Sequence, residues 1–99
     1  MSESEKTREY ELIVVLDESD QELLKQAKEN TEAAIKKRNA NIKTSEDWGS
    51  RKLFHEVRHI GKGHFYFYVF EAAGDAISKI NQDLQMNTHI LKTFLKRIS

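Results

Sequence analysis

The sequence predicts a single α+β domain of the ferredoxin-like βαββαβ type, in which a four-stranded antiparallel sheet carries two helices on one face. Three observations support this prediction. The length of 99 residues suits one compact domain, two stretches show helical periodicity, and four stretches rich in β-branched and aromatic residues alternate with them in the required order. We expect one domain over residues 1–99, with residues 1–7 as a flexible N-terminal extension.

The first strand and the first helix are predicted within residues 8–38. Residues 8–16 alternate polar and apolar side chains and end in a β-branched run, which is typical of a strand near the sheet centre. Their even-numbered members are the better candidates for the core face. In the helix that follows, Ser19 and Glu22 have the spacing of a capping box. Its apolar stripe consists of Leu23, Leu24, Ala27, Thr31, Ala34 and Ile35.

The second and third strands are predicted to form a hairpin. Residues 42–58 are too many and too polar for one regular buried strand, so we expect a bulge or a bend at Gly49. The tight turn is expected within residues 60–64, because the two glycines there adopt positive φ readily. The third strand, residues 65–71, is aromatic on both faces, so each face must contact other groups.

The second helix and the last strand complete the predicted fold. The helix begins at Gly74 and ends at Asn87, for which we expect the left-handed backbone conformation. Its buried stripe consists of Ile77, Ile80 and Leu84. The last strand, residues 89–98, should alternate between core and solvent, with Lys92, Phe94 and Lys96 pointing outward.

Composition and charge exclude several classes of protein. The chain has no cysteine, which removes disulfides and thiolate sites and fits a reducing compartment. The polar start of the chain and the absence of a bilayer-length apolar run predict a cytoplasmic protein without membrane contact. The net charge is zero, yet residues 1–32 hold ten acidic and four Lys or Arg residues, whereas residues 33–99 hold six and twelve. A local basic surface is therefore compatible with a neutral chain.

The sequence carries no pattern that predicts catalysis or metal binding. His55 and His59 are four residues apart, which on a strand separates their side chains by about 13 Å, too far to share one ion. The acidic residues Asp17, Glu18 and Asp20 begin a helix, where the helix dipole favours carboxylates. They would also repel the phosphate that an acylphosphatase of this topology binds. We expect no enzyme, no cofactor and no small-molecule substrate.

The outward face of the predicted sheet is the candidate interaction surface. Because no helix covers it, it would expose a large apolar patch for a lone domain, which indicates a protein partner. The predicted partner surface consists of Ile13, Val15, Phe65, Phe67 and Phe94. An exposed sheet without a partner and a homodimer made by stacking two such faces are the alternatives.

Basic residues gather on the second strand, the hairpin and the last strand. Lys and Arg side chains bind phosphate, so these residues are candidates for contacts with RNA. They are Arg51, Lys52, Arg58, Lys62, Lys92, Lys96 and Arg97.

Several segments resemble the bacterial small-subunit ribosomal protein six family. They are REYE from residue 8, EDWGSRKL from residue 46, GHF from residue 63, VFEA from residue 69 and the closing segment, residues 87–97. The segment at 46–53 is the most specific, because the fold does not dictate a Trp, a Gly and a basic pair there. Immediately after it the family has a small residue, Tyr, Pro and Ile, whereas this chain has Phe54, His55, Glu56 and Val57.

The resemblance implies a non-catalytic structural protein of the cytoplasmic ribosome with the βαββαβ fold. Its implied partners are the central domain of small-subunit rRNA and ribosomal protein eighteen. It also implies that Arg8 and Lys92 contact RNA, because the family presents basic residues at these positions. The alternative is a ferredoxin-like protein-interaction or ligand-sensing domain that homodimerises through its sheet and binds no RNA.

Overall fold

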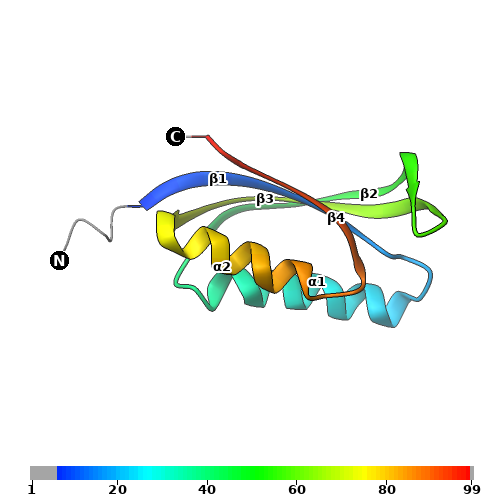
Figure 1. Cartoon of the computed structure of the whole chain (residues 1–99), viewed down its shortest axis with the longest axis horizontal. Helices are drawn as coiled ribbons and strands as arrows, with labels where there is room; N and C mark the ends of the chain where they lie inside the picture. Colours follow the sequence, from blue (N-terminus) through cyan, green and yellow to red (C-terminus); the bar gives the residue numbers. More distant parts are fainter. Residues whose placement is uncertain (1–6, 99) are drawn as a thin grey trace.

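The computed structural model describes residues 7–98, and its elements alternate as the sequence predicts. In chain order they are β1 (Thr7–Leu16), α1 (Gln21–Lys36), β2 (Asn41–Val57), β3 (Ile60–Ala73), α2 (Gly74–Gln85) and β4 (Ile90–Arg97). The described strands form one antiparallel sheet in the order β2-β3-β1-β4, and both helices cover the same face of it (Figure 1). The ferredoxin-like prediction is therefore confirmed. Neither described helix is long and apolar enough to cross a membrane.

The start of β1 corrects one predicted boundary. Thr7 belongs to the strand and pairs with Ala73 of β3. The flexible extension predicted over residues 1–7 therefore cannot include Thr7, and residues 1–6 lie outside the described part of the chain.

The core lies between the helices and the even-numbered face of β1. Leu12 and Val14 are fully buried and lie opposite Tyr68 and Tyr66 of β3. The even-numbered residues of β3 therefore face the helices, and Phe65, like the other odd-numbered residues of β3, points to the helix-free face. The register between β1 and β3 thus decides which aromatic residues are available at the surface.

Helix α1 begins with a different cap from the predicted one. Oδ1 of Asp20 accepts hydrogen bonds from the backbone N–H groups of Glu22 and Leu23, at 2.9 and 3.1 Å. Ser19 instead donates its own N–H and hydroxyl to Oδ1 of Asp17, and these bonds lower the pKa of that carboxyl. The predicted capping box is wrong because Asp20, one position later, reaches the free N–H groups of the first turn.

Helix α2 ends without the expected left-handed residue. Its C-cap, Met86, has the right-handed backbone conformation. The side-chain oxygen of Asn87, Oδ1, accepts a hydrogen bond from the backbone N–H of His89 at 2.9 Å. Outside glycine, the described residues with positive φ are Asn39, after α1, and the two residues of the β2–β3 turn. The prediction for Asn87 is wrong because its side chain, and not its backbone conformation, closes this turn.

The β2–β3 hairpin turns at Arg58 and His59, and the predicted turn at the glycines is wrong. Their φ values of 52° and 65° are those of a type I′ turn, the two-residue turn that matches the twist of a hairpin. Gly61 and Gly63 lie within β3. A Cβ on Gly63 would lie 2.4 Å from Cγ1 of Val15, so this glycine permits close packing against β1.

The distal part of the hairpin, which we call the hairpin arm (residues 50–63), curls away from the helices over the helix-free face (Figure 1). The bend predicted at Gly49 is confirmed: its φ is 80°, and the β2–β3 register shifts between Asp47 and Gly49. At the tip, the guanidinium of Arg58 donates hydrogen bonds to the carbonyl oxygens of Thr88 and Ile90, at 3.0 and 3.2 Å. These bonds hold the tip of the arm against the start of β4.

Candidate functional site

The helix-free face of the sheet carries a strip of apolar side chains from three strands. Ile13 of β1 lies opposite Phe67 of β3 on one side and opposite Phe94 of β4 on the other. Phe65 extends the strip along β3, and Phe94 is half exposed. We call these four residues the apolar strip. They are four of the five residues predicted from the sequence as a partner surface.

Val15, the fifth predicted residue, is buried. Its side chain is 1% exposed, and it packs beneath Gly63 of the hairpin arm. The prediction that Val15 is exposed is wrong because strand alternation alone does not include the arm that folds over this end of the sheet.

A groove of about 430 Å³ separates the hairpin arm from the apolar strip. Its described lining includes cationic side chains from both walls, Arg51 and Lys52 on the arm and Lys92 on β4, and no acidic residue. The rest of the lining is apolar or aromatic, apart from one histidine. It consists of Val15, Leu53, Phe54, His55, Val57, Phe65 and Phe94. We call this feature the basic groove.

Aromatic rings hold two of the groove's cations in place. Nζ of Lys92 lies 5.5 Å from the centre of the Phe94 ring. The guanidinium of Arg51 lies 5.6 Å from the centre of the Trp48 ring, and its Nε donates to the Trp48 carbonyl at 3.2 Å. Such cation–π contacts orient a charge without neutralising it, so both groups stay available to an anion.

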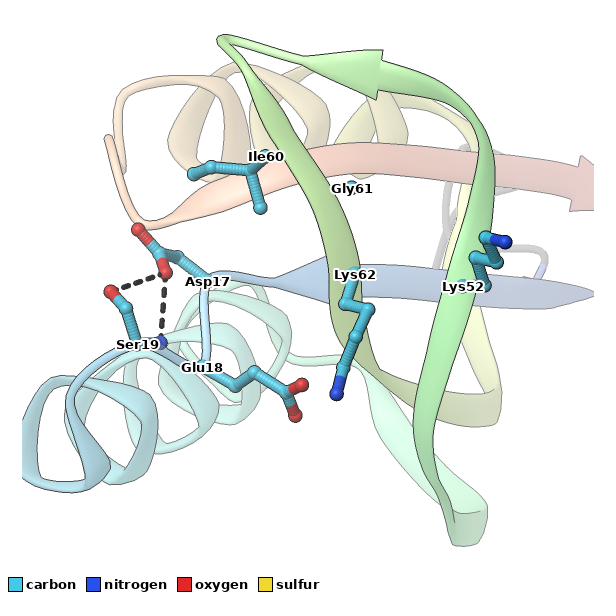
Figure 2. A pocket seen from close by; sticks show the side chains of 7 residues that line it. All are labelled: Asp17, Glu18, Ser19, Lys52, Ile60, Gly61 and Lys62. Carbon is cyan, nitrogen blue, oxygen red and sulfur yellow. Dashed lines mark hydrogen bonds between the residues drawn. The ribbon is translucent and has the colours of Figure 1, made fainter.

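The structure does not bring the other predicted cations into this groove. Arg58 is engaged with backbone carbonyls at the tip of the arm. Lys62 lines a second pocket of about 550 Å³ between the arm and the β1–α1 loop, which Lys52 also lines, and Figure 2 shows the side chain of Lys62 beside Glu18.

The cations at the two ends of the chain lie at the opposite end of the sheet. Arg8 is opposite Ala72, and Arg97 is opposite Tyr10, so both have the parity of the helix-covered face. Lys96 lies on the helix-free face, opposite Glu11.

The far end of the helix-free face has acidic character. Nζ of Lys43 lies 3.2 Å from Oε2 of Glu9 and 3.3 Å from Oε2 of Glu71, and these hydrogen bonds raise the pKa of Lys43. The charges on the helix-free face are therefore separated, with the basic groove at one end and the carboxylates of Glu9 and Glu71 at the other.

A charged cluster fastens the base of the arm to the loop between β1 and α1. Nε2 of His64 lies 2.6 Å from Oδ1 of Asp47, and its Nδ1 lies 3.6 Å from Oε1 of Glu18. The His64 ring also stacks on Tyr66. The hydrogen bond from His64 lowers the pKa of Asp47. This cluster supports the arm from the helix side.

Sequence reasoning missed Phe54, which is fully exposed and lines the basic groove. It lies in a four-residue bulge, because Lys52 pairs with Lys62 while the next paired residue, Val57, is opposite Ile60. The signal was present in the sequence, since Phe54 stands where the family has a small residue.

A family sequence model and curated relatives place the chain in one family. The sequence model of the family described as ribosomal protein S6 matches residues 9–97. The small ribosomal subunit protein bS6 of Leptospira biflexa serovar Patoc is 33% identical over 90 residues, which cover 91% of this chain and 96% of that protein. The bS6 protein of Wigglesworthia glossinidia brevipalpis is 29% identical over 93 residues, covering 92% and 80%. The crystal structure of 30S ribosomal protein S6 from Thermotoga maritima has the same fold, with a TM-score of 0.86, 20% identity and coverage of 94% and 89%.

Proposed function

The chain belongs to the ribosomal protein S6 family and is a structural protein of the small ribosomal subunit, and from this premise we propose that it binds the central domain of small-subunit rRNA together with ribosomal protein eighteen. Its ribosomal role places it in the cytoplasm. In the proposed function the protein acts by assembly: it holds RNA and a second protein in a fixed relative position.

One observation carries this proposal, namely that the basic groove and the apolar strip adjoin on the same helix-free face. Lys and Arg side chains bind phosphates whatever the base sequence of the RNA. Arg51, Lys52 and Lys92 supply such cations at one edge of the strip. The strip itself is apolar and its Phe94 is half exposed, which suits a protein surface, although the indole of Trp48 already stacks on Phe67. Two ligands of different chemistry can therefore bind side by side.

We assign RNA to the groove and to the lysines of β4, and ribosomal protein eighteen to the part of the apolar strip outside the groove lining, which is Ile13 and Phe67. Lys92 and Lys96 share the helix-free face and are four residues apart, so their side chains are separated by about 13 Å along β4. This row continues the charge of the groove along the sheet edge. Arg8 and Arg97 can add phosphate contacts at the far end, on the other side of the sheet.

The direct test is equilibrium binding of the protein to a central-domain rRNA fragment across a salt series, with and without ribosomal protein eighteen. We expect tight, salt-sensitive binding only when both proteins are present, because a neutral chain offers few phosphate contacts alone. Lys79→Ala, which removes an exposed cation from α2, is the matched control and should leave binding unchanged. Absence of binding in both conditions by a folded sample would contradict the proposal.

The exposed Phe94 of the strip favours one alternative, a homodimer formed through the helix-free face without RNA. Burial of an apolar face responds little to salt, unlike phosphate binding. Sedimentation of the protein alone at low and high salt separates the two: a salt-insensitive dimer together with no RNA binding supports the alternative.

A further inference from the structure

We propose that the basic groove receives one unpaired nucleotide of the bound RNA, with its base stacked on Phe54 and its phosphate held by Arg51 and Lys92. This inference rests on the proposed function and specifies the ligand of one part of the surface.

The first observation is the position of Phe54. Its ring is fully exposed although it lines the groove, and it lies outside the buried core. The bulge between Lys52 and Val57 places it away from the regular strand pairing. A ring in this position contributes little to the free energy of folding, and both of its faces are accessible. A flat apolar ring of this kind is the platform on which nucleobases stack.

The second observation is the charge of the groove. Arg51 lies opposite Gly63 on β3, so its side chain has the parity of the helix-free face, as does that of Lys92. They flank an apolar floor that includes Val15 and Phe65, and the described lining contains no carboxylate. An apolar peptide segment in this groove would leave both cations without a counter-charge. A nucleotide would place its base against the apolar floor and its negatively charged phosphate beside the two cations.

The third observation is size. A volume of about 430 Å³ lies in the range of small-ligand sites, and it suits one nucleotide and not a double helix. The bases of paired A-form RNA are stacked inside the helix, so a side chain cannot stack on them. An unpaired nucleotide can turn its base outward. The groove should therefore select a bulged or looped position in the RNA.

The test uses the full complex of this protein, ribosomal protein eighteen and the central-domain rRNA fragment. We expect Phe54→Ala to weaken RNA binding about five- to 160-fold, the range found when a stacking side chain is removed. The slope of affinity against salt should not change, because no charge is lost. Phe54→Tyr keeps a stacking ring and should restore binding.

Met86→Ala is the matched control, because it removes another exposed apolar side chain, 77% exposed, from the C-terminal end of α2. It should bind RNA like the unaltered protein. Equal binding by Phe54→Ala and the unaltered protein would overturn the inference. Because Phe54 is outside the core, both variants should keep their melting temperatures, and this measurement verifies that they are folded.

A second experiment identifies the nucleotide. Each unpaired nucleotide of the rRNA fragment is replaced in turn by an abasic one, and binding is measured for the unaltered protein and for Phe54→Ala. We expect one abasic position to weaken the unaltered protein while Phe54→Ala is insensitive to it, because the same stack is removed from either side. If the effects of the two changes multiply at every position, the base does not stack on Phe54.

The outcomes distinguish this inference from the proposed function. If the unaltered protein does not bind the rRNA fragment even with ribosomal protein eighteen, the proposed function fails. If it binds and Phe54→Ala changes nothing, only the nucleotide site fails. If Phe54→Ala weakens binding of ribosomal protein eighteen in the absence of RNA, the groove holds a protein segment and the inference is overturned.

Discussion

The indole of Trp48 lies flat on the ring of Phe67, with ring centres 4.9 Å apart and planes 9° apart. This stack joins β2 to the helix-free face of β3 beside the bend at Gly49. The indole Nε1–H also donates to Oε1 of Glu46 at 2.8 Å. Trp48 is thus fixed at the point where β2 leaves its regular register, and it supports the hairpin arm from its base.

Trp48→Ala should destabilise the protein by about 1–3 kcal/mol, because it removes both the stacking energy and apolar burial. For a domain of this length, the melting temperature should fall by roughly 4–24 °C. Thermal unfolding followed by circular dichroism measures it. The melting temperature of Trp48→Phe, which retains a stacking ring, should lie between those of the unaltered protein and Trp48→Ala. An unaltered melting temperature for Trp48→Ala would show that the stack does not hold the bend.

Tyr68→Phe should cost about 1–2 kcal/mol of unfolding free energy. The buried Tyr68 donates its hydroxyl to Oε2 of Glu32 at 2.8 Å, and hydrogen bonds to charged groups are among the stronger ones. Burial and this bond raise the pKa of Tyr68. Denaturant unfolding measures the cost. In a Glu32→Gln background the same change should cost less, and an equal cost in both backgrounds would exclude Glu32 as the partner that matters.

Stability should fall in acid as Asp47 is protonated. The hydrogen bond from His64 holds the pKa of Asp47 below its ordinary value near 3.8. Because the folded pKa is lower than the unfolded one, the contribution is present above about pH 4 and is lost as pH falls through the folded value. Asp47→Asn should therefore reduce the slope of unfolding free energy against pH below pH 4. Parallel curves for the two proteins would contradict this account.

Gly63→Ala should destabilise the protein by about 1–3 kcal/mol, the usual cost of overpacking. The new Cβ would meet Cγ1 of Val15 at 2.4 Å and the backbone oxygen of Leu16 at 3.3 Å. Gly61→Ala is the matched control, because its nearest neighbour is a Glu56 side-chain atom at 3.9 Å. Denaturant unfolding should separate the two variants. Equal stabilities would mean that the arm can lift from β1 without cost.

Lys92→Ala combined with Lys96→Ala should weaken RNA binding by the complex and lower its salt slope by about two, one for each lost phosphate contact. Both side chains are exposed, so the melting temperature should stay the same. The measurement is affinity for the central-domain fragment at several salt concentrations. An unchanged slope would remove these lysines from the RNA surface.

Hydrophobic periodicity was sufficient to predict the element order, the buried face of each helix and the outward direction of Lys92, Phe94 and Lys96. These features depend on local alternation, which one sequence displays directly. The hairpin turn was misplaced because Arg58 and His59 adopt positive φ without the Gly or Asn that would signal it.

The basic groove could not be predicted from local patterns. It depends on how far the arm bends, and this is set by the register shift beside Gly49 and by the bonds from Arg58 to carbonyls 30 and 32 residues away. Alternation correctly placed Val15 on the helix-free face of the sheet, but the arm covers that residue. Parity predicts which side of a sheet a residue occupies, whereas burial depends on what folds over that side.

The bonds between Arg58 and the start of β4 have a consequence for synthesis on the ribosome. One wall of the basic groove comes from residues 51–55 and Val57, and the other from Lys92 and Phe94. While the chain is being made, the hairpin can form as soon as β3 emerges, but its tip has no carbonyls to bind until residues 88–90 follow. The complete groove therefore forms only after β4 has been synthesised and has docked, so a nascent chain cannot present this binding surface before β4 is in place.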